Sequence, residues 1–343
     1  MAKAYHVMSS MLSSVLLIMV ALDFTAAQTG VCYGTLGNNL PSAADTVALY
    51  NQYNIRRMRI YDPNPATLQA LRGSPIEVIL GVPNTDLQRL AASQANANTW
   101  VQNNVRNYPT VRFRYIAVGN EVSPIRDTAQ YASFVLPALR NVNNAISAAG
   151  LANQIKVSTA VETGLLGNSY PPADGVFRSD VTGFINPIVR FLADTRAPLL
   201  LNLYTYFSYI DNKGSISLNY ALLQPNSGVT VPGGIRYDNL FYAILDATYA
   251  ALEKAGGSAV EIVVSESGWP SAGGDTTSVE YARIYNNNLI QRVKNGTPKR
   301  PGRPIQTYIF AMYDENQKGG PEIERNFGIF RPNRQAKYPI SFN

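Results

Sequence analysis

The 343-residue chain is moderately basic, with 29 lysines and arginines against 23 aspartates and glutamates, and it contains one histidine and one cysteine. The histidine, His6, falls in a segment expected to be removed, which excludes Ser-His-Asp and Cys-His mechanisms and histidine metal sites. The cysteine, Cys32, excludes an intramolecular disulfide and is expected to be a small buried hydrophobe. Acid–base chemistry therefore falls to carboxylates, lysine or tyrosine, and no metal or cofactor is expected.

The first 27 residues have the layout of a secretory signal peptide. Lys3 supplies a positive charge, residues 11–22 are apolar, and Thr25-Ala26-Ala27 offers small residues before Gln28. The apolar run is too short for a membrane span, and no other run approaches that length. We expect a mature domain of residues 28–343, secretion to the apoplast or cell wall rather than the vacuole, and no association with a membrane.

Strand-like apolar runs alternate with helix-like segments along this domain. The strand-like runs are residues 30–34, 57–61, 77–82, 115–121, 155–160, 198–206, 261–266 and 305–313. The helix-like segments are residues 42–53, 66–72, 86–105 with a break near Ser93, 128–149, 181–193, 239–255 and 279–294. Residues 208–237 are rich in Gly, Asn and Pro, and are expected to form a small hairpin insertion after the sixth strand.

Eight strand–helix units with no compositional break predict an α/β fold of the closed (β/α)8 TIM-barrel type in a single domain. The first strand is followed neither by GxGxxG nor by a lysine-bearing phosphate loop, which argues against an open doubly wound sheet. Chemistry in such barrels takes place at the carboxyl ends of the strands. The candidate catalytic groups are therefore the carboxylates at those ends.

Two glutamates, Glu121 and Glu266, end apolar strands among small residues. Because side chains alternate along a strand, Glu121 is expected to share a face with Gly119, and Glu266 with Val264 and Ile262. Strands four and seven lie on opposite sides of an eight-stranded ring, so the two carboxylates can face each other across its mouth. Two opposed carboxyl groups, without a histidine, are sufficient for glycoside hydrolysis. The alternative interpretation is that both carboxylates form structural salt bridges.

Aromatic residues gather at the same strand ends, namely Tyr61, Tyr204, Tyr206, Phe207 and Trp269. Flat apolar rings at such positions can stack on sugar rings. Core packing is the alternative for each of them, and most of all for Phe207. Trp269 is favoured as a sugar contact because it follows the seventh strand closely.

Six segments carry recognisable motifs: residues 30–34 (GVCYG), 37–41 (GNNLP), 58–62 (MRIYD), 118–122 (VGNEV), 263–271 (VVSESGWPS) and 310–318 (FAMYDENQK). With these motifs the chain resembles, over its whole mature length, the plant endo-β-1,3-glucanases of glycoside hydrolase family 17, of the pathogenesis-related type. One position departs from the family pattern. After the sixth strand the family usually has Tyr-Pro-Tyr-Phe, and Thr205 replaces that proline here, so the loop loses a fixed φ.

The resemblance implies a (β/α)8 barrel and a retaining double displacement on β-1,3-glucans such as callose, fungal wall glucan and laminarin. It implies that Glu121 is the general acid/base, that Glu266 is the nucleophile, and that Asn120 contacts the sugar hydroxyl beside the reacting carbon. Lys318 would help to keep Glu266 ionised. The subsites would be lined by Tyr61, Tyr204, Phe207 and Trp269, and a polar group near the nucleophile would comprise Glu315, Lys318 and Glu324.

Two other functions remain open from the sequence: a hydrolase of mixed β-1,3-1,4-glucan within the same family, and a non-catalytic wall-glucan-binding protein. The presence of both Glu121 and Glu266 argues against the second. The basic residues are scattered, apart from Lys299-Arg300 with Arg303, so we interpret the net charge of +6 as attraction to polyanionic surroundings such as a cell wall rather than to nucleic acid. We expect a monomer whose partner is the glucan polysaccharide.

Overall fold

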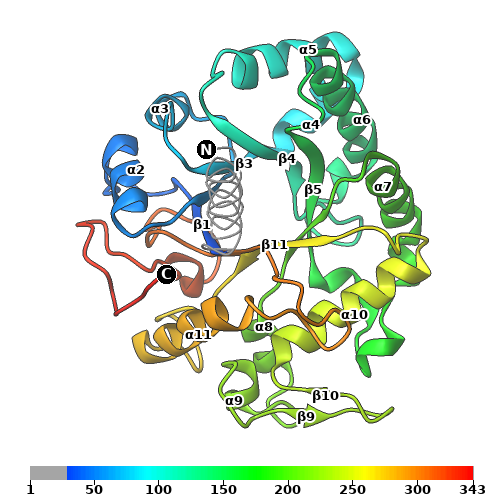
Figure 1. The fold of residues 1–343 in the computed structure, drawn as a ribbon, viewed down its shortest axis with the longest axis vertical. Helices are drawn as coiled ribbons and strands as arrows, with labels where there is room; N and C mark the ends of the chain where they lie inside the picture. Colours follow the sequence, from blue (N-terminus) through cyan, green and yellow to red (C-terminus); the bar gives the residue numbers. More distant parts are fainter. Residues whose placement is uncertain (1–28, 343) are drawn as a thin grey trace, which may run out of the picture.

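The described part of the chain, residues 29–342 of a computed structural model, forms a closed barrel of eight parallel strands with helices around it (Figure 1). The expected signal peptide, residues 1–27, lies outside the described residues. Each barrel strand pairs with the one before it in the chain, and the last closes the ring onto the first, so the (β/α)8 prediction is confirmed. The strands are β1 (Thr29–Tyr33), β2 (Arg57–Ile60), β3 (Glu77–Val82), β4 (Arg112–Asn120), β5 (Lys156–Glu162), β8 (Leu199–Asn202), β11 (Ile262–Ser267) and β12 (Thr307–Ile309).

Helices follow the strands as the alternation predicted. The expected break near Ser93 separates α4 from α5, and the Ser93 hydroxyl caps α5 by accepting a hydrogen bond from the Asn96 amide. No helix within residues 29–342 is both long and apolar enough to cross a membrane. The helices that cover the barrel are α2 (Ala43–Gln52), α3 (Pro65–Ala70), α4 (Leu87–Ala92), α5 (Gln94–Val101), α6 (Ala132–Ala148), α7 (Thr182–Thr195), α10 (Leu240–Lys254) and α11 (Val279–Arg292).

The segment after β8 is more elaborate than the expected hairpin. It contains α8 (Thr205–Asp211), α9 (Leu218–Ala221) and a two-stranded hairpin of β9 (Val229–Thr230) and β10 (Arg236–Tyr237). A second hairpin, of β6 (Leu166–Asn168) and β7 (Val176–Phe177), lies between β5 and α7 and packs against α10. Strands of two or three residues carry no periodic pattern, so the sequence could not predict this second hairpin.

Two hydrophobic layers hold the barrel together. A small cluster inside the ring contains Cys32 and Val263, and a larger one between the strands and the helices contains Ile262 and Val264. Cys32 is fully buried, and its Sγ donates to the Ser265 carbonyl at 3.3 Å, so the prediction of a structural cysteine is confirmed. The predicted inward face of β11 was wrong, because Val263 rather than Val264 points into the barrel.

A one-residue bulge in β11 explains how its glutamate nevertheless reaches the mouth of the barrel. Val264 pairs with Leu201, and Glu266 pairs with the next residue of β8, Asn202, so β11 carries one extra residue here. A bulge turns the side chains that follow it to the other face of the sheet. Strict alternation fails at this point, and Glu266 faces the interior although Val264 does not.

A matching bulge interrupts β4 before its carboxyl end. Ala117 pairs with Ser158 of β5, whereas Asn120 pairs with Ala160, so three steps along β4 match two along β5. Gly119 has a φ of 79° and Glu121 a φ of 50°, the left-handed region that strands avoid. As a result the consecutive residues Asn120 and Glu121 both line the mouth of the barrel, which alternation could not have predicted.

Candidate active site

A cleft of about 1260 Å³ opens at the carboxyl ends of the strands, where the barrel fold was expected to place its chemistry. It is also lined by three polar residues that the sequence did not single out as binding groups, Arg59, Glu162 and Asn202. The structure brings all but one of the predicted site residues into this cleft: Tyr61, Asn120, Glu121, Tyr204, Phe207, Glu266, Glu315, Lys318 and Glu324.

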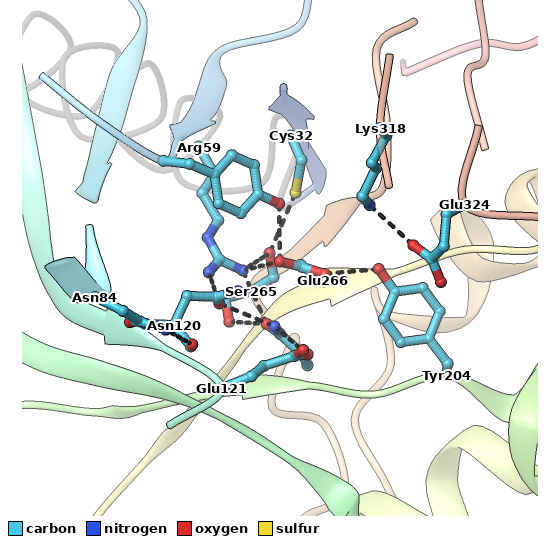
Figure 2. A network of polar contacts seen from close by, with 12 residues as sticks. Cys32, Arg59, Asn84, Asn120, Glu121, Tyr204, Ser265, Glu266, Lys318 and Glu324 are labelled. Carbon is cyan, nitrogen blue, oxygen red and sulfur yellow. Dashed lines mark hydrogen bonds and ion pairs between the residues drawn. The ribbon is translucent and has the colours of Figure 1, made fainter. Parts of the chain in front are cut away.

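Glu266 is surrounded by hydrogen-bond donors (Figure 2). Its Oε1 accepts from Arg59 Nη1 at 2.8 Å and from the Tyr61 hydroxyl at 2.8 Å, and its Oε2 accepts from the Tyr204 hydroxyl at 2.7 Å. Burial raises the pKa of both phenols well above the usual value, so each keeps its proton and remains a donor. Three donors, one of them cationic, stabilise negative charge on this carboxylate.

Arg59 is the centre of the polar network beneath the cleft. Its side chain is 1% exposed, and besides Glu266 its Nη1 contacts Asn202 Oδ1 at 2.8 Å and the Ser265 carbonyl at 3.0 Å. Its Nη2 donates to Asn120 Oδ1 at 2.6 Å. One rigid guanidinium fork thus ties the ends of β4, β8 and β11 to β2 and fixes their relative positions.

Glu121 has very different surroundings. Its Oε1 accepts one hydrogen bond from the neutral amide Asn202 Nδ2 at 2.8 Å. Burial, and after it the negative charge of Glu266, raise the pKa of Glu121 to about 7, while the hydrogen bond from Asn202 works in the opposite direction. This carboxyl group can therefore hold a proton near neutral pH.

Two asparagines connect these carboxylates. Asn202 reaches Glu121 with its amide nitrogen and Arg59 with its oxygen, so it bridges the two halves of the site. Asn120 is fixed through its backbone, because Asn84 accepts from its amide nitrogen at 2.8 Å and donates to its carbonyl at 2.9 Å. The side-chain oxygen of Asn120 accepts from Arg59 at 2.6 Å and from Asn202 at 3.2 Å, so both residues hold this side chain in place.

The predicted polar group of Glu315, Lys318 and Glu324 lines the same cleft as Glu266. Lys318 pairs with Glu324 at 3.0 Å, and its Nζ lies 4.2 Å from the centre of the Phe310 ring. Glu315 is buried and accepts a hydrogen bond from the Leu36 amide at 2.8 Å. The cation in contact with Glu266 is Arg59, at 2.8 Å, and the role predicted for Lys318 stays a prediction.

Trp269 does not line the cleft, although the sequence predicted it as a sugar contact. Its side chain is fully buried, and its Nε1 donates to the Thr276 carbonyl at 3.0 Å. It packs against Tyr206 and Tyr285, with ring centres 5.1 and 5.7 Å away. Tyr206 is buried as well, whereas Phe207, for which core packing was most favoured, is 38% exposed in the cleft. Core packing, the alternative considered for each aromatic residue, holds for Trp269 and Tyr206.

The model of the glycosyl hydrolases family 17 matches residues 29–342 of the chain. The chain belongs to this family. A glucan endo-1,3-beta-glucosidase of Vitis vinifera is 58% identical to this family 17 chain over 95% of each sequence. A basic vacuolar isoform of the same enzyme from Nicotiana plumbaginifolia is 53% identical over 96% of this chain and 91% of its own length.

A solved structure is similar to the family 17 chain throughout. It is CJP38, a beta-1,3-glucanase and allergen of Cryptomeria japonica pollen, which has a TM-score of 0.89 and 48% identity. The likeness covers 92% of this chain and 99% of that one. The match to the family model, over residues 29–342, includes the barrel and both glutamate-bearing strand ends.

Sequence reasoning missed Arg59 and Asn202 as site residues of this family 17 hydrolase. Arg59 stood in the motif MRIYD, where an arginine in the middle of an apolar strand is costly unless a buried carboxylate compensates it. This energetic cost of burial was the signal in the sequence that could have identified Arg59 as a site residue. Asn202 stood inside the apolar run 198–206 and carried the same kind of signal, since a buried amide must find partners.

Proposed function

We propose that this family 17 hydrolase cuts internal β-1,3-glucosidic bonds of β-1,3-glucans by a retaining double displacement, with Glu266 as nucleophile and Glu121 as general acid/base. The observation that carries the proposal is the contrast between two carboxyl groups in one cleft. Glu266 accepts hydrogen bonds from a cation and two phenols, whereas burial raises the pKa of Glu121 to about 7. An ionised nucleophile beside a protonated acid is the resting state that this mechanism needs.

In the first step, an oxygen of Glu266 attacks the anomeric carbon and the bond to the leaving oxygen breaks. Glu121 gives its proton to that oxygen, which leaves as a hydroxyl group, and a glycosyl ester remains on Glu266. We expect the side-chain amide nitrogen of Asn120 to donate to the sugar hydroxyl next to the reacting carbon.

In the second step, water attacks the anomeric carbon from the side that the leaving group vacated. Glu121, now ionised, takes a proton from this water, and the bond to Glu266 breaks, which restores both carboxyl groups. Two inversions give net retention, which requires carboxyl groups about 5–5.5 Å apart. Proton NMR of the first product tests this, and a first product of α configuration would overturn the mechanism.

The size of the cleft supports action on a polysaccharide. Its volume of about 1260 Å³ exceeds the roughly 300–1,000 Å³ of pockets that enclose one small ligand. Phe207 presents an exposed ring in this cleft, where a sugar can stack on it. Both carboxylates and their donors come from one chain, so we expect a monomer to be active.

Release of reducing ends from laminarin, compared with release from a mixed-linkage β-1,3-1,4-glucan, tests the proposed substrate. We expect rapid release from laminarin as a series of oligosaccharides, as an endo-acting enzyme produces. Preferential release from the mixed-linkage glucan would reassign the specificity. Binding to laminarin without any release would show a glucan-binding protein instead.

The cellular destination remains open between two compartments. The relatives include a basic vacuolar isoform from Nicotiana plumbaginifolia, so the vacuole and the apoplast are equal candidates and the expected preference for the apoplast is not supported. Secretion through the expected signal peptide is part of this proposal, and a fluorescent fusion to the carboxyl end of the whole chain would test it.

A further inference from the structure

A second groove, of about 600 Å³, lies at the end of the barrel opposite the catalytic cleft. It is formed where β3, β4 and β5 begin, between the segment after α5 and the turn after α6. Arg106, Arg112 and Arg114 line this basic groove, together with Tyr108 and a single carboxylate, Glu77. The basic groove shares no lining residue with the catalytic cleft.

The two chain segments that form the basic groove come from stretches without acidic residues. Between Asp86 and Glu121 the sequence has no aspartate or glutamate, and between Asp127 and Glu162 it again has none. The groove is lined by residues 105–114 from the first stretch and 149–155 from the second. Positive charge here is therefore not neutralised by neighbours in the sequence.

Folding neutralises only a small part of this positive charge. Glu77 is engaged mainly by Arg57, whose Nε donates to its Oε2 at 3.1 Å, and Arg112 lies 3.9 Å from the same carboxylate. Arg106 and Arg114 are exposed, and neither has a carboxylate partner within residues 29–342. Unneutralised like charges in one groove repel one another, and an anionic ligand would relieve that repulsion.

A fourth arginine extends the rim of the basic groove. Arg72 stacks on the Tyr108 ring at 4.9 Å, and its Nη2 donates to the Asn107 carbonyl at 2.6 Å, so its guanidinium is held in place. The fold thus gathers four arginines that are scattered along the sequence.

We propose that the basic groove binds a polysaccharide that carries carboxylates, a polyuronide, and so holds the enzyme on an anionic polymer while the catalytic cleft stays free. Guanidinium groups pair with carboxylates through two parallel hydrogen bonds, and carboxylates repeated along a sugar chain can meet several arginines at once. Single-stranded nucleic acid fits less well, because base stacking needs rows of exposed aromatic rings. Here Phe113 is buried and Arg72 covers Tyr108.

The test measures the affinity of the whole protein for a short oligogalacturonate by calorimetry at low and at moderate salt. One variant removes the three arginines of the groove, and a matched variant removes the same charge from exposed positions elsewhere. We expect the groove variant to lose at least about tenfold in affinity, because each lost contact adds to the loss, and the matched variant to lose less than about twofold. The two variants are R106Q/R112Q/R114Q and R140Q/R190Q/R331Q.

Hydrolysis of a soluble β-1,3-glucan should be equal in all three proteins, and so should their thermal unfolding. Should the triple variant fold poorly, R106Q/R114Q changes only exposed side chains without ion pairs and should still lose about threefold. If the groove variant and the matched variant lost the same affinity for oligogalacturonate, net charge alone would explain the loss, and the proposal would be overturned. Equal affinity of the native protein for a single-stranded oligonucleotide, or competition between oligogalacturonate and the glucan, would overturn it as well.

Discussion

The ends of β4 and β11 share a backbone device and give their glutamates opposite surroundings. Each strand carries one extra residue shortly before its glutamate, which turns that side chain into the same cleft. Glu266 then meets a guanidinium and two phenols, and Glu121 meets one neutral amide. The backbone thus places both carboxyl groups in the cleft, and the side chains around them give Glu266 three hydrogen-bond donors and Glu121 one.

Removing Glu266 should have the largest effect. We expect Glu266→Ala to lower kcat by at least about 10⁴-fold on laminarin, because the glycosyl ester cannot form. Azide can occupy the vacated space and should restore turnover, with a product of inverted configuration. Glu322→Ala, an exposed acid near the cleft, is the control and should keep full activity. Substantial activity of Glu266→Ala without azide would contradict the assignment.

Glu121→Gln should have the next largest effect, about 10²–10⁴-fold on kcat for glucan. Substrates with a good leaving group need less protonation and should lose less. In the native enzyme Glu121 must be protonated to act as an acid, so kcat/KM should fall as the pH rises through about 7. Measurement of pH profiles checks this, since the variant should lack that decline. A decline of the same shape in both proteins would point to another acid.

Arg59→Lys keeps the charge beneath the cleft and removes the fork that joins Glu266, Asn202 and Asn120. We expect kcat to fall by about 10²-fold with KM nearly unchanged, because the reacting groups lose their alignment. Arg57→Lys on the same strand, paired with Glu77 at the opposite end of the barrel, is the matched control. Equal effects of the two substitutions on kcat would mean that Arg59 only stabilises the fold.

Asn202→Ala should have a smaller effect and act on the pH profile. The amide of Asn202 favours the charged form of Glu121, so its removal should raise the pKa of Glu121 further and move the decline in kcat/KM to higher pH. We expect a rate loss of about tenfold from the broken hydrogen bonds. Ser265→Ala breaks a contact to the Asn202 oxygen without touching either carboxylate and should leave the position of the decline unchanged.

The sequence predicted the barrel well because eight buried strands that alternate with amphipathic helices are compatible with few other topologies. It located Glu121 and Glu266 because both are charged residues at the ends of apolar strands. It could not predict the direction of these side chains, since a bulge depends on pairing with β5 or β8 and breaks the alternation on which the prediction relied. Nor could it predict that Arg59, about 200 residues away in the chain, is the cation beside Glu266.

Trp269 provides the last test, with the smallest expected effect. Its position just after β11 predicts a contact with the sugar, whereas its burial predicts none. The ring follows the strand that bears Glu266 but lies behind it, against Tyr206 and Tyr285, whereas Phe207 is exposed in the cleft. Trp269→Phe should lower the free energy of unfolding by about 1–3 kcal/mol and change KM by less than about twofold. Phe207→Ala should instead raise KM about threefold or more at nearly unchanged stability, because one stacking surface is lost. If Trp269→Phe raised KM as much as Phe207→Ala, the indole would have to reach the substrate, and the predicted subsite role would stand after all.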